Sequence, residues 1–422
     1  MDNTLENDLS LATGHRSLGD LATTFPLWPP IPQHATASGT SYPVEVTYAY
    51  DRVDPQLFAQ PPLPGLERWA PLLPPLAPGL AMAEGGTALV PAPELAAWAG
   101  LNAELFIKDE SRNPTWSHKD RFNLCSISVA VATRASGVVL SSSGNHGASA
   151  AAYAARAGLP CIVLVSRDTP PAVQSFVRAY GAAVLAVPRA GSQTVIRQIV
   201  ERLGYHFAHH SWGCEGYKTL AYEVFAQLGG RVPAAVFIPT SNAQLLFGVW
   251  KGFRELHELG VAATTPVMVA CEPSTRAAHF QAFETGQDQV EIVEGPTIAY
   301  AIGSSVSSTL GMLALRESSG VAISLPDDET RAAQAALAGR GMWQEASGAI
   351  SLAGLRQVLA AGRRFDGPAV CVTCSSGFKD VGVGRDEAPA SELEWQAVCR
   401  TLATHYGTQP VLAEQLQPFL GA

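Results

Sequence analysis

Two stretches decide the fold: Asn113-Pro-Thr-Trp-Ser-His-Lys-Asp-Arg121 and, further along the chain, Ser141-Ser-Ser-Gly-Asn-His-Gly147. The first contains Lys119, and the second is a serine-rich turn followed by a run typical of a helix. A single lysine is usually a solvated surface charge. A polar turn that begins a helix binds anions, because the first amides of a helix have no partner within it. The pairing of this lysine with an anion-binding turn is what makes the two stretches informative together.

Composition narrows the class of protein. The chain has 422 residues, of which 47% are hydrophobic and 15% charged, which is typical of a globular protein with one large α/β domain or two lobes. The net charge of −9 and the absence of a Lys/Arg run give no support to a nucleic-acid partner, and we expect none. No apolar stretch approaches the length of a membrane span, and the first 25 residues are too polar for a signal peptide. Seven scattered cysteines indicate reduced thiols, so we expect a cytoplasmic protein.

The only CxxC motif joins Cys371 and Cys374. A zinc site usually needs a second such pair, and a redox motif normally opens a helix. This pair instead follows the alternating pattern of a strand, and no cysteine precedes Cys125. We therefore expect no bound metal.

Beyond residue 104, short apolar runs alternate with amphipathic stretches. Strands are expected at 105–108, 137–141, 161–166, 183–187, 235–239, 267–272, 321–325 and 369–373. Helices are expected at 145–157, 171–180, 192–203, 216–228 and 244–259. This alternation predicts βαβ units and parallel sheets, with a ligand at the carboxyl ends of the strands. Residues 1–45 lack periodicity and contain several prolines, so we expect a loosely ordered arm there, before a short strand at 42–51.

The lysine motif and the serine-rich turn resemble those of the fold-type II enzymes that depend on pyridoxal 5'-phosphate (PLP), and most of all those of threonine synthases. Lys119 matches the lysine that forms a Schiff base with the cofactor in that family. Further stretches match in the family's order, and the resemblance spans roughly residues 84–380. These stretches are 215–223, 295–303, 345–349 and 374–380.

The resemblance implies an α/β fold of two lobes. Each lobe has a mainly parallel sheet flanked by helices, and the active site lies in the cleft between them. It implies an N-terminal arm over 1–60, a large cofactor-binding lobe made of 61–123 and 213–422, and a small lobe over 124–212. It also implies a homodimer.

The resemblance assigns roles to individual residues. It places the Asn145 amide against the phenolic oxygen of PLP and Cys374 beside the ring nitrogen. The phosphate cradle is expected at Thr240, Ser241, Asn242, Ala243 and Gln244. The residues expected around the substrate are Ser142, Ser143, His146 and Gly147 at its carboxylate, with Trp116 and His118 beside the lysine.

The sequence departs from the family's pattern at several of these positions. The cradle keeps Asn242-Ala243 but lacks both glycines of the family, so we expect the Thr240 and Ser241 hydroxyls to donate to the phosphate directly. Trp116 and His118 stand where threonine synthases have a small residue and a phenylalanine, which predicts a reshaped pocket. Asp120 and Arg121 are interpreted as a helix cap and a surface ion pair.

The function implied is elimination or replacement at the β or γ carbon of an amino acid, with a specialised substrate. The freed Lys119 amine acts as the base for the α-proton. A neutral thiol at Cys374 favours elimination over racemisation or transamination. Two alternatives stay open: a serine/threonine dehydratase or diaminopropionate-type ammonia-lyase, because Asn145-His146-Gly147 has their form, and a non-catalytic ligand-binding relative.

Overall fold

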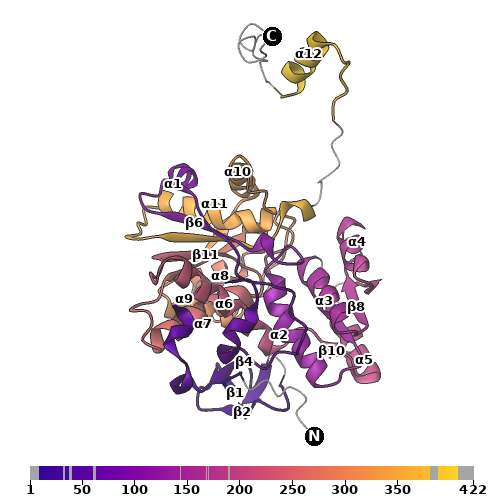
Figure 1. Cartoon of the computed structure of the whole chain (residues 1–422), viewed down its shortest axis with the longest axis vertical. Helices are drawn as coiled ribbons and strands as arrows, with labels where there is room; N and C mark the ends of the chain where they lie inside the picture. Colours follow the sequence, from indigo (N-terminus) through magenta and orange to yellow (C-terminus); the bar gives the residue numbers. More distant parts are fainter. Residues whose placement is uncertain are drawn as a thin grey trace. The chain divides into compact units, whose positions relative to one another are not determined.

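Three sheets form the framework of the computed structural model (Figure 1). The structure describes residues 9–31, 34–37, 40–59, 63–142, 144–167, 169, 171–188, 191–380 and 388–406. The chain divides into two compact units, Met1–Val381 and Gly382–Ala422. The second unit contains one described helix, α12 (Trp395–Tyr406), and all other elements belong to the first unit.

The largest sheet has six strands in the order β13-β12-β11-β14-β6-β5. Its strands are β5 (Leu89–Pro91), β6 (Leu105–Asp109), β11 (Ala235–Pro239), β12 (Val267–Pro273), β13 (Val321–Leu325) and β14 (Ala369–Thr373). All neighbours are parallel except β5, which pairs antiparallel with β6. The central strands are apolar along their whole length, as expected for parallel strands that are covered on both faces.

Helices cover both faces of this sheet. On one side lie α1 (Pro93–Ala99), α10 (Asp327–Ala338) and α11 (Ala346–Ala360), and on the other α6 (Ser211–Gln227), α7 (Gln244–Glu258), α8 (Ala278–Thr285) and α9 (Thr309–Glu317) (Figure 1). Strand β11 shows why both layers are needed. Val236 and Ile238 belong to the core that contains Leu246 of α7, whereas Ala235 and Phe237 belong to the core that contains Ile350 of α11. Successive side chains of a strand point to opposite faces, so an all-apolar strand must be covered twice.

A second parallel sheet has four strands in the order β10-β7-β8-β9. It consists of β7 (Val138–Ser141), β8 (Cys161–Val165), β9 (Ala183–Ala186) and β10 (His206–Phe207). The helices that connect its strands are α3 (Asn145–Arg156), α4 (Pro171–Ala179) and α5 (Ser192–Leu203), and α2 (Lys119–Ala132) leads into it. These strands all fall within the predicted small lobe, 124–212, whose boundaries stay a prediction.

The N-terminal region differs from the loosely ordered arm expected from the sequence. It forms an antiparallel sheet in the order β2-β1-β4-β3, with β1 (Ala12–Ser17), β2 (Thr24–Pro26), β3 (His34–Ala37) and β4 (Thr40–Tyr48). Buried polar contacts attach β4 to the helices: Glu45 pairs with Arg254 at 2.6 Å, and the Tyr48 hydroxyl donates to Glu215 at 3.0 Å. The prediction was wrong because these partners lie more than 160 residues away in the sequence.

Arg121 anchors the first turn of α2 in a buried ion cluster. Its Nε atom lies 2.7 Å from Glu110 Oε2, and its Nη1 atom lies 2.6 Å from Glu223 Oε1. Lys108 of β6 also pairs with Glu223, at 2.7 Å. Because Arg121 is fully buried, its interpretation as part of a surface ion pair is wrong. Asp120 lies within the first turn of α2, whose N-cap position is His118, so its interpretation as a helix cap is also wrong. Asp120 instead accepts hydrogen bonds from Thr115 and Ser149.

No helix in the described part of the chain is both long and apolar enough to cross a bilayer. The same residues contain no group of three or more His, Cys, Asp or Glu side chains arranged to hold a metal ion.

Replacing Arg121 by Met should lower the free energy of unfolding by about 3–5 kcal/mol, because it leaves the buried Glu110 and Glu223 carboxylates without their cation. Urea unfolding followed by tryptophan fluorescence measures this change. The matched control is Arg231→Met, which removes an exposed pair with Glu104 and should leave the unfolding midpoint unchanged. Equal effects of the two substitutions would contradict the proposed anchoring role.

Candidate active site

A cavity of about 340 Å³ lies at the carboxyl ends of strands from both parallel sheets. Its wall includes Ser141 and Val165, at the ends of β7 and β8, and Pro239, at the end of β11. Cys374 follows β14 directly and also lines the cavity. Ligands of α/β proteins bind where helices start from the carboxyl ends of strands, so this cavity is the candidate active site.

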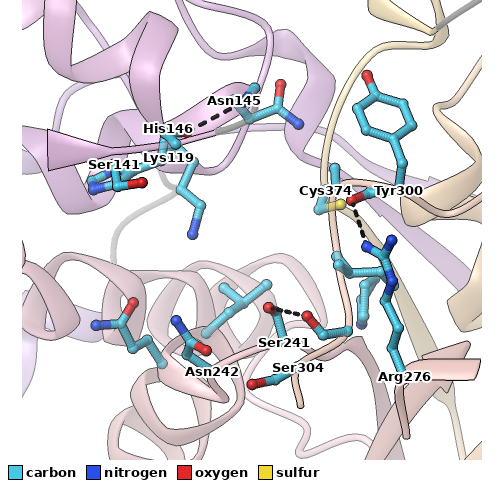
Figure 2. Close-up of a pocket in the computed structure, with 18 of the residues that line it drawn as sticks. Lys119, Ser141, Asn145, His146, Ser241, Asn242, Arg276, Tyr300, Ser304 and Cys374 are labelled. Atoms are coloured by element: carbon cyan, nitrogen blue, oxygen red, sulfur yellow. Dashed lines mark hydrogen bonds between the residues drawn. The ribbon is translucent and has the colours of Figure 1, made fainter. Parts of the chain in front are cut away.

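The Lys119 amine points into this cavity, between the starts of α3 and α7 (Figure 2). Its Nζ donates to the Tyr217 hydroxyl at 3.1 Å. Burial lowers the pKa of the Lys119 amine to about 8, because a buried ammonium loses its hydration. The Lys119 amine therefore loses its proton more readily than an exposed lysine, and a larger fraction of it is neutral, and so nucleophilic, near neutral pH.

The other four lysines of the chain all have an anionic or amide partner. Lys108 donates to Glu223 at 2.7 Å, Lys218 to Glu255 at 3.0 Å, Lys251 to Glu215 at 2.7 Å, and Lys379 to the Asn145 amide oxygen at 2.8 Å. Only Lys119 combines a place on the cavity wall with a hydroxyl as its one protein partner among the described residues. Lys119 is therefore the lysine that can act as a nucleophile or base in the cavity.

The Ser142–Gly147 turn begins α3 beside the lysine. The Ser142 hydroxyl accepts from the Gly144 amide at 3.2 Å and from the Gly147 amide at 2.9 Å, which fixes the turn. Ser142 and His146 line the cavity, whereas Gly147 does not, and the Gly147 amide is bonded to the Ser142 hydroxyl. Ser143 lies outside the described residues. The helix start offers partial positive charge to an anion.

The Asn145 amide lines the cavity and is held in one orientation. Its oxygen accepts from the Lys379 ammonium at 2.8 Å, so its nitrogen is the donor to Glu345, at 2.9 Å, and to Ser375, at 3.2 Å. Burial raises the pKa of the Glu345 carboxyl. The sequence matched Lys379 and Glu345 to the family but gave neither a role, because only the fold brings them beside Asn145.

The start of α7 forms the opposite wall of the cavity. Ser241, Asn242, Ala243 and Gln244 line it, and Ala243 adopts a left-handed conformation with φ of 55°. Thr240 does not line it: the side chain is buried, and its hydroxyl donates to the Ile238 carbonyl at 2.9 Å. The Thr240 hydroxyl was expected to donate to the phosphate, and this expectation is wrong because the hydroxyl is already bonded within the protein. The Ser241 hydroxyl donates to the Gly303 carbonyl at 2.9 Å, so the helix amides remain the principal donors to an anion here.

Trp116 was also expected beside the lysine, and the structure places it elsewhere. Its backbone is left-handed, with φ of 63°, and 49% of its surface is exposed. It is not part of the cavity wall, so it does not narrow the space around Lys119. His118, by contrast, is buried and lines the cavity.

Several lining residues were not predicted, among them Arg276, Glu294, Tyr300, Ser304, Ser305 and His209. Tyr300 and Ser304 belong to or follow the 295–303 stretch, whose match to the family was the one available signal. Arg276 had no such signal, because it lies in a short 3-10 turn after β12.

Comparison with known proteins decides the family. The family model described as "Pyridoxal-phosphate dependent enzyme" matches residues 80–377. The chain belongs to this family. It is 32% identical over 328 residues to a threonine synthase of Methanosarcina acetivorans, covering 75% of this chain and 80% of that protein. It is 35% identical over 313 residues to a threonine synthase of Halalkalibacterium halodurans, covering 72% and 85%.

Solved structures of PLP enzymes share the fold. A threonine deaminase from T.th. superposes with a TM-score of 0.60 at 25% identity, covering 72% of this chain and 94% of that one. Maize serine racemase superposes with a TM-score of 0.61 at 21% identity, covering 76% and 93%. The chain is thus a threonine synthase-like, fold-type II lyase that depends on PLP.

The donor set of the cavity fits this cofactor. PLP needs an amine for its aldehyde, an anion cradle for its phosphate and a partner for its ring nitrogen. Lys119, the start of α7 and Cys374 line one cavity and offer these three groups. Burial raises the pKa of the Cys374 thiol to about 12, so this partner stays neutral.

Borohydride reduction of the PLP-loaded protein, followed by peptide mapping, should find the cofactor on Lys119 alone. Lys119→Arg should abolish the absorbance band of the imine, because a guanidinium does not form an imine. Label found on Lys108, Lys218, Lys251 or Lys379 would refute the assignment.

Proposed function

We propose that this enzyme removes or replaces a small, uncharged substituent on an amino acid, and that it uses O-phosphohomoserine poorly. One observation supports this restriction. Among the described residues that line the cavity, the only Lys, Arg, Asp or Glu side chains are those of Lys119, Arg276 and Glu294. The cavity therefore offers little cationic compensation for a phosphorylated side chain.

The guanidinium of Arg276 is already engaged. Its Nε donates to the Gly295 carbonyl at 2.9 Å and its Nη1 to the Tyr300 carbonyl at 3.3 Å, while the Glu294 carboxylate lies 4.0 Å away. If the start of α7 holds the cofactor phosphate, a phosphate on the substrate would enter the cavity without a free cation to pair with. Burying such a dianion is unfavourable unless it is paired. An amino acid with a neutral leaving group avoids this cost.

Each residue is proposed to have one task. When bound, PLP withdraws electrons from the α-carbon of the attached amino acid. Lys119 Nζ, released as a neutral amine, accepts the α-proton. The amides at the start of α3, with Ser142, hold the substrate carboxylate, and the Asn145 amide, fixed by Lys379, lies against the phenolic oxygen.

Cys374 and the start of α7 complete the proposed cofactor site. The backbone amides around Ser241, Asn242, Ala243 and Gln244 bind the phosphate, and the Cys374 thiol faces the ring nitrogen. A thiol with a pKa of about 12 leaves the ring nitrogen unprotonated, which limits electron withdrawal and favours elimination.

A dehydratase or ammonia-lyase reaction is the second candidate. It is supported by the Asn145-His146-Gly147 form and by the 25% identity to the threonine deaminase from T.th.. A non-catalytic relative is disfavoured, because a ligand sensor has no need of a neutral amine at Lys119.

We further propose that the enzyme is a cytoplasmic homodimer. Exposed aromatic side chains next to one another support an interface between copies: Trp116, Trp343 and Phe378 are 49%, 37% and 67% exposed. Hydrogen bonds join the backbone around them, from Ser376 N to Trp116 O and from Gly377 N to Trp343 O. Exposed apolar patches of this kind mark interaction surfaces. Seven free cysteines support a reducing compartment.

Steady-state kinetics of the purified, PLP-loaded enzyme test the substrate proposal. We expect kcat/KM for O-phosphohomoserine well below about 10⁴ M⁻¹s⁻¹, the lower end of the common enzyme range, and a higher value for an amino acid with an uncharged β-substituent such as L-serine. A value for O-phosphohomoserine at or above that level would identify a plain threonine synthase.

Substitution of Cys374 tests the ring-nitrogen partner. Cys374→Ser should retain most activity, because a hydroxyl is also neutral. Cys374→Asp should raise racemisation and transamination relative to elimination, because a carboxylate keeps the pyridine nitrogen protonated. Product ratios measured by chiral chromatography report the change. An unaltered ratio in Cys374→Asp would remove this side chain from the cofactor.

A further inference from the structure

His118 lies directly before the reactive lysine, at a position where threonine synthases have a phenylalanine. Its side chain is buried, with 7% of the residue exposed, and it lines the cavity. The ring packs against Tyr217, with centroids 5.5 Å apart, and Tyr217 also accepts the hydrogen bond from Lys119. The imidazole is thus fixed beside the amine by an aromatic neighbour.

Hydrogen bonding defines which nitrogen of His118 carries the proton. Nδ1 lies 3.0 Å from the Cys374 carbonyl oxygen. A carbonyl oxygen only accepts, so Nδ1 must be the donor. The pKa of the imidazole lies well below its ordinary value, mainly because of burial and also because of the neighbouring Lys119 ammonium. A neutral ring with a proton on Nδ1 has a lone pair on Nε2.

The Nε2 lone pair has no donor among the described protein residues, and PLP does not supply one. Its phosphate and phenolate oxygens accept hydrogen bonds, and beside the neutral Cys374 thiol its ring nitrogen also acts as an acceptor. The cofactor therefore adds acceptors to this cavity, whereas His118 needs a donor. Nε2 is not sealed off by the protein, and because His118 lines the cavity, a substrate that displaces water there becomes the source of that donor.

We propose that His118 Nε2 accepts a hydrogen bond from an O–H or N–H group on the substrate side chain and thereby selects hydroxy- or amino-substituted amino acids. This inference rests on the proposed function and adds the chemistry of the substituent. An ester phosphate, a thioether or a halogen at the same place offers no donor and leaves Nε2 unpaired. His118 is a specificity-determining residue in this account, and Lys119 remains the base.

Two variants of the PLP-loaded enzyme separate the roles of the ring. His118→Phe keeps an aromatic ring against Tyr217 but removes the acceptor, and His118→Gln keeps an acceptor at the end of a side chain of similar length. The probes are L-serine, which carries a donor, and β-chloro-L-alanine, which carries none. His118→Phe should lower the ratio of kcat/KM for L-serine to that for β-chloro-L-alanine by about 10- to 100-fold. His118→Gln should restore most of the ratio.

The exposed His405 of α12 offers a matched control, and His405→Phe should leave the ratio unchanged. An unchanged ratio in His118→Phe would overturn the proposal while elimination itself stands. If the PLP-loaded wild type converts neither probe, the proposed function fails instead.

Nuclear magnetic resonance of ¹⁵N-histidine-labelled, PLP-loaded wild type decides the hydrogen bond without turnover. His118→Gln identifies the resonance by its loss. We expect an unprotonated Nε2 that shifts when L-serine is added and shifts much less with L-alanine, which lacks the hydroxyl. A protonated Nε2, or equal shifts with both ligands, would refute the proposal even if His118→Phe does not fold.

Discussion

A half-buried lysine amine on the cavity wall, without a carboxylate partner, is the constraint on which the active site depends. A charged ammonium is stable in a protein interior only when an anion or several acceptors replace its hydration. The fold supplies such partners to Lys108, Lys218 and Lys251, and it withholds them from Lys119. With a single hydroxyl partner, the Lys119 amine has a pKa of about 8, and this makes it both a nucleophile and a base.

The surrounding structure holds this unfavourable arrangement in place from two sides. Arg121, in the same helical turn, is fixed by buried carboxylates on Glu110 and Glu223. On the other side, the His118 amide donates to the Cys374 carbonyl at 3.0 Å, so the lysine motif is tied to the segment after β14. The position of Lys119 is thus determined by α6 and by the large sheet, and not by its own interactions. Ion clusters that look merely structural therefore have a catalytic consequence.

Local sequence patterns predicted much of the fold and part of the active site. The strands expected at 235–239 and 369–373 coincide with β11 and β14, because buried parallel strands are continuous apolar runs bounded by turn residues. The family's motifs brought Lys119, Asn145 and Cys374 to one cavity. Features that depend on distant partners were missed: the N-terminal sheet, the burial of Arg121 and the place of Arg276 in the wall. The prediction for Trp116 was wrong because its left-handed backbone turns the side chain away from the cavity. No local sequence pattern predicts this conformation for a tryptophan.

The central claim concerns the protonation of one amine, and titration of the lysine Nζ atoms measures it most directly. The chain has only five lysines, so ¹⁵N-lysine-labelled protein freed of PLP should give a spectrum that can be assigned with Lys119→Arg. The account predicts that the Lys119 resonance titrates with a midpoint near pH 8. A midpoint at or above the ordinary lysine value of 10.5 would show that this amine is compensated after all, and would contradict the account.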